Sequence, residues 1–266
     1  MLALFIAFVG SLQAQTVTIG TGTTTVAGTN GVPIYRSGTT STFHHSKSIQ
    51  LLTAAQLSAA GLMNGSSITA WGYNKTNNGT PSGANGWTLN VYLKNSSNTT
   101  LASGTSWTTM ISGATLGYTA TITSANMPSA TGYWMWPISG FTYTGGAIEC
   151  YIEWFPATTM VSPMTTNTFS WQYTAAGNQA MGTSSATAIP GTQATWTTQA
   201  RFYNTQITAS CLAPTAVTSV IPDCGNNQFS LSVNVTALNG APSVTVQSDN
   251  GNPGGPYSNV GVGTYL

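Results

Sequence analysis

The chain has 266 residues, of which 41% are hydrophobic and only 3% are charged, and its formal net charge is +1. So small a charge excludes the basic surface that nucleic acids and anionic membranes attract, and we expect neither as a partner. The hydrophobic content excludes an intrinsically disordered chain. Thr, Ser, Asn and Gly take the place of charge, and these residues suit turns and the wet faces of strands.

The N-terminal segment, residues 1–14, is predicted to be a signal peptide. Residues 2–9 form an apolar run too short to span a bilayer, and Ala14 puts a small residue before the expected cut. No Lys or Arg precedes this run and Leu12 is large for its position, so we expect the natural start to lie upstream. The alternative is a buried N-terminal strand. A signal peptide predicts a secreted or outer-surface protein that is not inserted in a membrane after cleavage.

Short strands and turn signals fill residues 15–209. The one good helical signal is residues 53–61, where Thr53 is a suitable N-cap, Gln56 completes a capping box and Gly61 is a stop. The predicted strands cover residues 16–19, 32–35, 48–52, 67–74, 87–94, 114–123, 133–138, 147–155, 168–174 and 200–208. Runs of strands without helices indicate two packed sheets. The predicted fold class is therefore all-β: an antiparallel, jelly-roll-like β-sandwich with one short helix.

Residues 147–155 form the clearest strand, because apolar and polar side chains alternate strictly along them. The inward side would carry Ile148, Cys150, Ile152 and Trp154, and the outward, solvated side Glu149, Tyr151 and Glu153. Residues four apart on a strand are separated by about 13 Å, whereas paired glycosidase carboxylates lie about 5 to 9.5 Å apart. Glu149 and Glu153 are therefore not expected to act as a catalytic pair. Cys150 is expected to be a buried core thiol.

A domain boundary is predicted near residue 210. Residues 210–266 contain four predicted strands (216–220, 229–235, 243–248 and 260–265), whereas an immunoglobulin-like sandwich needs about seven. This part is therefore interpreted as a truncated immunoglobulin or fibronectin III-like domain, with further domains of the same polypeptide expected. In an oxidising compartment Cys211 and Cys224 are predicted to form a disulfide, worth about 3 kcal/mol by loop closure.

Three stretches resemble one known family. They are residues 48–62 running into 65–69, which follow a strand, short helix, Gly and strand pattern; residues 148–154; and residues 211–265. These are similar to the β-rich modules of large secreted surface proteins in bacteria that use type IX secretion. The resemblance implies a non-catalytic part of an adhesin, or an accessory part of a secreted enzyme, exported by means of a C-terminal sorting domain.

Aromatic residues on strands are the candidate ligand-binding residues. An exposed row of rings could stack on the sugars of a polysaccharide, which is the expected partner together with other cell-surface ligands. The alternative is that the rings are core, because residues two apart on a strand share a face. The candidates are Trp134, Trp136, Trp171 and Tyr173, with Trp71, Tyr73 and Tyr133 as further members of the same set.

Other motifs give weaker signals. His44 and His45 would point opposite ways on an extended chain, so no metal site is predicted there. Residues 249–255 faintly resemble a calcium loop but lack its terminal Glu, and a plain turn is expected. The Asn-x-Ser/Thr sequences at Asn64, Asn78 and Asn98 receive no role. No catalytic residue and no cofactor are predicted.

Three functional hypotheses remain from the sequence. The first is a structural or adhesive module of a secreted or surface multidomain protein. The second is a carbohydrate-binding module accessory to a secreted hydrolase, which requires solvent-exposed, coplanar tryptophans. The third, a hydrolase in its own right, has only two histidines and four carboxylates available.

Overall fold

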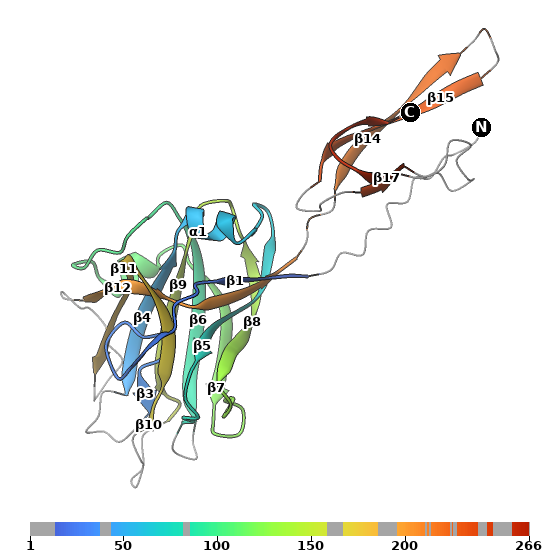
Figure 1. The fold of residues 1–266 in the computed structure, drawn as a ribbon. Coiled ribbons are helices and arrows are strands. Elements are labelled where there is room, and N and C mark those ends of the chain that lie inside the picture. The colour runs from blue at the N-terminus through green and yellow to red at the C-terminus, as the bar shows by residue number, and fades with distance from the viewer. Residues whose placement is uncertain are drawn as a thin grey trace. The chain divides into compact units, whose positions relative to one another are not determined.

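In a computed structural model, the protein consists of two compact units, residues 15–209 and the segment that begins at Ser210 (Figure 1). The division falls at the boundary expected from the sequence. Residues 1–13 of the predicted signal peptide lie outside the described residues. The structure describes residues 14–37, 44–81, 86–158, 167–185, 196–210, 212, 214–223, 225, 228–238, 244–246 and 257–265.

The first unit is an antiparallel β-sandwich with two short helices, which confirms the predicted fold class. Its helices are α1 (Ala54–Ala59) and α2 (Trp107–Ile111). Its strands are β1 (Gln15–Ile19), β2 (Thr24–Ala27), β3 (Arg36–Ser37), β4 (His45–Leu52), β5 (Ser67–Lys75), β6 (Trp87–Ser96), β7 (Thr115–Ile122), β8 (Gly132–Thr142), β9 (Ala147–Pro156), β10 (Asn167–Thr168), β11 (Ser170–Ser185), β12 (Thr197–Tyr203) and β13 (Thr205–Ala209).

One long strand, β11, joins the two halves of the sandwich. The strand order is β1-β13-β5-β11-β4-β9-β6-β7, with β8 beside β5, and with β2 and β12 beside β11. The first residues of β11 pair with β2 and, at Trp171, with Lys75 of β5, whereas residues from Ala180 onward pair with β4. The sequence predicted only residues 168–174 of this strand. The chain instead continues through a register shift between Ala175 and Ala180.

The predicted strand 200–208 is two strands in the structure. β12 pairs with β11 and β13 pairs with β1 and β5, so the chain changes partners at Asn204. The Asn204 side-chain amide donates to the Gly22 carbonyl at 2.7 Å, and its side-chain oxygen accepts from Thr174 Oγ1 at 2.8 Å. These hydrogen bonds satisfy the polar groups at a corner where the sheet ladder is interrupted.

The main core lies between the two halves of the sandwich and is rich in aromatic side chains. The inward side of β9 supplies Ile148, Cys150, Ile152 and Trp154, all fully buried, and β6 supplies Trp87, Leu89, Val91 and Leu93. Both inward faces follow the alternation of apolar and polar residues in the sequence. On residues 87–94 this alternation predicts an inward face of Trp87, Leu89, Val91 and Leu93 and an outward face of Thr88, Asn90, Tyr92 and Lys94. Trp87 and Trp154 stack with ring centroids 5.2 Å apart.

Residues 31–35 are buried but do not form the edge strand predicted for residues 32–35. The backbone carbonyl groups of this segment accept hydrogen bonds from side chains rather than from a neighbouring strand. Gln50 Nε2 donates to the Gly31 carbonyl at 2.9 Å, and the Trp171 indole donates to the Ile34 carbonyl at 2.9 Å. An irregular segment can be buried only when its backbone polar groups are paired in this way.

Helix α1 forms as predicted. The Thr53 side chain accepts from the backbone N–H of Gln56, and the Gln56 side chain accepts from the backbone N–H of Thr53, which is a complete capping box. Leu57 is the buried residue of the helix, and Gly61 follows it with a φ of 84°. The positive φ explains why Gly ends this helix.

A second hydrophobic cluster covers the outer face of the sheet formed by β11, β4, β9 and β6. Its buried members are Ile49, Leu51, Leu101, Trp107, Ala147, Tyr151, Met181 and Trp196. Helix α2, which the sequence did not predict, brings Trp107 onto this face, where its ring stacks on Trp196 at 5.6 Å between centroids. The expectation that Glu149, Tyr151 and Glu153 form a solvated face is therefore wrong. Glu149 and Tyr151 are 2% and 1% exposed.

The second unit is a small set of antiparallel strands. They are β14 (Thr215–Asp223), β15 (Gln228–Ala237), β16 (Val244–Val246), β17 (Tyr257–Val260) and β18 (Gly263–Tyr265). β14, β15 and β18 form one sheet, and β16 pairs with β17, a strand the sequence did not separate from β18. Val233 and Val235 are its buried core, whereas Val217 and Val220 of β14 are 62% and 61% exposed. The predicted Cys211–Cys224 disulfide lies outside the described residues.

Among the helices of the described residues, neither is long and apolar enough to cross a membrane.

Candidate functional site

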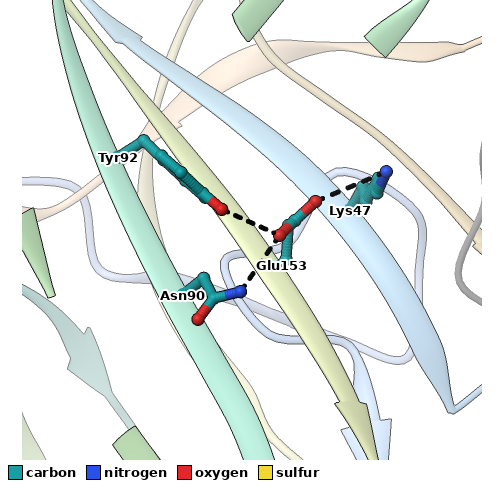
Figure 2. A network of polar contacts seen from close by, with 4 residues as sticks. All are labelled: Lys47, Asn90, Tyr92 and Glu153. Carbon is teal, nitrogen blue, oxygen red and sulfur yellow. Dashed lines mark hydrogen bonds and ion pairs between the residues drawn. The ribbon is translucent and has the colours of Figure 1, made fainter. Parts of the chain in front are cut away.

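The outer face of β9 carries a group of ionisable and polar side chains centred on Glu153 (Figure 2). Lys47 of β4 forms an ion pair with Glu153 Oε1 at 3.4 Å. On the other side, Asn90 Nδ2 and the Tyr92 hydroxyl of β6 donate to Glu153 Oε2 at 3.1 and 3.2 Å. The register explains this meeting, because Lys47 and Asn90 are the direct cross-strand neighbours of Glu153 on β4 and β6.

Burial controls the electrostatics of this group. The side chains of Lys47 and Glu153 are only 7% and 14% exposed. Burial lowers the pKa of Lys47, and the Glu153 carboxylate opposes that shift. Burial, followed by the Glu153 carboxylate, raises the pKa of Tyr92 to about 12. The Lys47 ammonium also lies 4.7 Å from the Trp107 ring centroid, a cation–π contact that ties it to helix α2.

Glu149, at the other end of the same face, is held by uncharged donors. Ser96 Oγ and Asn98 Nδ2 donate to its Oε1 at 2.8 and 2.6 Å, and the Tyr151 hydroxyl contacts its Oε2. The Tyr151 hydroxyl also lies 2.6 Å from the Met110 carbonyl at the end of α2. A buried carboxylate is tolerated where several donors surround it in this way.

The segment that covers this face is anchored by the same polar side chains. Lys94 Nζ and the Tyr151 hydroxyl both meet the Met110 carbonyl, the former at 2.9 Å. The Leu101 backbone N–H donates to the Asn178 carbonyl of β11 at 2.6 Å. These polar contacts hold residues 98–111 against the sheet. Each carboxylate of β9 has three side-chain partners in all.

This arrangement offers little for catalysis. Glu149 and Glu153 lie four residues apart on one continuous strand and are built into separate networks, as strand geometry indicated. An acid–base pair also needs a free lone pair or proton within reach of a substrate. The contacts of both carboxylates are instead internal, to side chains of neighbouring strands and loops.

The predicted aromatic ligand-binding residues belong to the core. Trp134, Trp136 and Trp171 are 6%, 0% and 0% exposed, and the Trp134 ring stacks on Trp171 with centroids 6.5 Å apart. All eight tryptophans of the chain are described, and all eight are buried. The condition set for a tryptophan sugar-binding platform is therefore not met, because a buried ring has no face to offer a ligand. The alternative that these rings are core residues agrees with their burial.

Tyr173 and Tyr133 are the two members of that set that are partly exposed, and Tyr173 is the one named among the first four candidates. The Arg201 guanidinium lies 4.5 Å from its ring centroid, and Arg201 also donates to Gln199 Oε1 at 2.7 Å. Its ring is thus already covered on one face by a cation. A single ring in this state does not make a row.

The two adjacent histidines lie where β4 begins. Their ring centroids are 4.4 Å apart, and His44 also meets the Trp87 ring edge to face at 5.9 Å. Burial, together with the neighbouring His44, lowers the pKa of His45 to about 4. Among the described residues no group of three His, Cys, Asp or Glu side chains is placed to hold a metal ion.

Cys150 is fully buried, as expected from the sequence. Burial raises the pKa of its thiol to about 12. Because the thiolate is the reactive form, this thiol is inert near neutral pH.

Sequence reasoning missed Lys47, Asn90 and Tyr92 as partners of Glu153. The alternation of residues 87–94 correctly placed Asn90 and Tyr92 on the side opposite the core. It could not give the register between strands, and a carboxylate with a lysine on the neighbouring strand becomes visible only when that register is known.

Comparisons of the chain with known protein families, with curated proteins and with solved structures find no match.

Proposed function

We propose that this chain is a non-catalytic extracellular part of a secreted or cell-surface multidomain protein, with a structural or adhesive role. The observation that carries the proposal is the use made of the two carboxylates in residues 15–209. Glu149 and Glu153 each have three side-chain partners, and those partners hold α2 and the neighbouring strands in place.

The surface composition supports the same proposal. Charged residues make up 3% of the chain, so exposed strand positions are filled largely by short uncharged polar residues. Such a surface has weak charge repulsion, which favours association with other surfaces. The resemblance to modules of bacterial surface proteins exported by type IX secretion supports an extracellular location and further domains in the same polypeptide.

The carbohydrate-binding hypothesis is the second candidate. Without exposed tryptophans it has to rest on the partly exposed tyrosines of the predicted set, Tyr173 and Tyr133. Trp134→Ala would be a poor test, because the loss of a buried indole destabilises the fold and does not probe a binding surface. Tyr173→Ala, with Leu116→Ala on the exposed side of β7 as a matched control, separates binding from folding.

The test is a binding and turnover screen of the full chain against immobilised polysaccharides and ester, peptide and glycoside substrates. We expect no turnover and no binding that Tyr173→Ala abolishes. Turnover that disappears in Glu153→Gln or Glu149→Gln would contradict the non-catalytic assignment. Saturable polysaccharide binding that disappears in Tyr173→Ala and persists in Leu116→Ala would establish the carbohydrate-binding role instead.

The location is tested separately by fractionating cells that produce the protein. We expect the protein in the medium or on the outer surface. Its recovery from the cytoplasm, at the full length of the chain, would contradict an extracellular role.

A further inference from the structure

Four polar groups in the main core have no hydrogen-bond partner among the described residues. They are the indole N–H groups of Trp71 and Trp136 and the hydroxyl groups of Tyr73 and Tyr203. The side chains that carry them are at most 1% exposed. Buried polar groups of folded proteins are nearly always paired with protein or with an ordered water, so each of these four needs an explanation.

The four groups come from neighbouring side chains. The Tyr73 ring lies 6.2 Å from that of Trp71, 5.7 Å from that of Trp136 and 6.5 Å from that of Tyr203, measured between centroids. Trp71 and Trp136 are also direct cross-strand partners on β5 and β8. All three contacts of Tyr73 are edge to face, at centroid distances within the ordinary range for aromatic pairs.

The other side of this cluster is formed by Cys150 of β9. Burial, and then the nearby Cys150 thiol, raise the pKa of Tyr73 well above its ordinary value, and the Trp71 indole opposes that shift. Burial also raises the pKa of Tyr203, and the Arg201 guanidinium opposes that rise. None of these neighbours forms a hydrogen bond of acceptable geometry with either hydroxyl. A thiol is in any case a weak partner that leaves a phenol hydroxyl largely unsatisfied.

Other indoles in the same core are paired, which shows that the fold can satisfy such groups. The Trp154 indole donates to the Arg36 carbonyl and the Trp171 indole donates to the Ile34 carbonyl, both at 2.9 Å. The indole N–H groups of Trp71 and Trp136, in contrast, have no such carbonyl as a partner among the described residues.

We propose that the core encloses a hydration site in which at least one ordered water bridges the Tyr73 and Tyr203 hydroxyls and the Trp71 and Trp136 indoles. A buried water forms about three hydrogen bonds and needs only about 10–15 Å³. It can accept from the indoles and either accept from or donate to the hydroxyls. An anion would also accept from these donors, but Arg201, the cation beside Tyr203, already contacts the Tyr173 ring and Gln199 Oε1. Burying an uncompensated negative charge is far more costly than burying a water. Water is therefore the ligand that this group of side chains selects.

A crystal structure of the full chain, with magnetic relaxation dispersion of the water oxygen in solution, tests the site directly. We expect density for an ordered water within hydrogen-bond distance of at least two of the four polar atoms, and a matching long-lived water in solution. A core in which these atoms meet no water, or meet a halide in crystals grown with bromide, would overturn the proposal.

The sign of a stability change gives a second, independent test. In Tyr73→Phe and Tyr203→Phe the bridged hydroxyl is lost, so the denaturant midpoint should fall. If the hydroxyls are unpaired, their removal relieves a desolvation cost, and a midpoint equal to or above that of the unmodified chain overturns the site. Tyr143→Phe is the control, because its hydroxyl donates to the Gly146 carbonyl at 2.8 Å and its removal must lower the midpoint.

Discussion

The two faces of β9 are both buried, yet they are built from different chemistry. The inner face presents Ile148, Cys150, Ile152 and Trp154 to the core of the sandwich. The outer face presents Glu149, Tyr151 and Glu153, which are covered by α2, Trp107 and Trp196. Burial on the inner face is stabilised by apolar area, whereas burial on the outer face requires that each charged or polar group find partners.

Alternation along a strand identifies two faces without saying which of them meets solvent. A polar face can be covered by a later segment when neighbouring strands supply matching donors. Here Lys47 and Asn90 stand opposite Glu153, and Ser96 and Asn98 reach Glu149. The cover is held by these polar contacts as well as by the stack of Trp107 on Trp196, and it should be weaker and more sensitive to pH than the inner core.

The inner face should give the largest loss of stability. Trp154→Ala removes a stacked indole and leaves the Arg36 carbonyl unpaired, and we expect a loss of about 3–5 kcal/mol in the free energy of unfolding. Chemical denaturation measures it, with Leu116→Ala, whose side chain is 47% exposed, as the control of small effect. Similar losses in the two variants would mean that the inner face is not a packed core.

The second largest loss of stability should come from the outer face of β9, because helix α2 covers it. Trp107→Ala removes the ring that stacks on Trp196 and lies under Lys47, and we expect a loss of about 3 kcal/mol. Thr108→Ala, on the exposed side of α2, should change stability by less than about 0.5 kcal/mol. A Trp107→Ala loss as small as that of Thr108→Ala would show that α2 does not cover the sheet.

The two carboxylates of β9 should contribute unequally to the free energy of unfolding. Glu149→Gln places an amide among three donors at a buried position, and we expect a loss of about 2 kcal/mol. Glu153 is partly exposed and screened, so Glu153→Gln should cost about 1 kcal/mol or less. Thermal and denaturant unfolding of both variants would check this order, and the reverse order would mean that Glu153 is the more deeply buried group.

The smallest expected effect is on pH dependence. His45 lies on β4 two residues before Lys47, and burial lowers its pKa from 6.5 to about 4. The folded state thus binds its proton less readily than the unfolded chain. Its contribution is fully present above pH 6.5 and is lost as the pH falls from 6.5 towards 4. His45→Gln should flatten the stability profile in this window, and an unchanged slope would contradict the assignment.

Several features were predictable because their causes are local. The capping box at Thr53 and Gln56 and the stop at Gly61 need only nearby residues, and α1 forms as expected. The strict alternation of residues 147–155 predicted β9 and its inner face for the same reason.

Features that depend on contacts distant in sequence were not predictable. Helix α2 has a modest signal, with Ser106 as N-cap and only five residues, and it is held by the sheet rather than by propensity. The buried segment 31–35 is irregular because Gln50, Ser48 and Trp171, distant in sequence, satisfy its carbonyls. The partners of Glu153 depend on the register between strands, and alternation within one strand does not determine that register.

The most direct test of the covered outer face is carbodiimide labelling of carboxylates in the native full chain, read out by mass spectrometry. We predict that Glu149 remains unlabelled while the chain is folded and is labelled after denaturation, with Glu153 labelled slowly in the native state. Rapid labelling of Glu149 in the folded chain would contradict the account, because it would place the outer face of β9 in solvent.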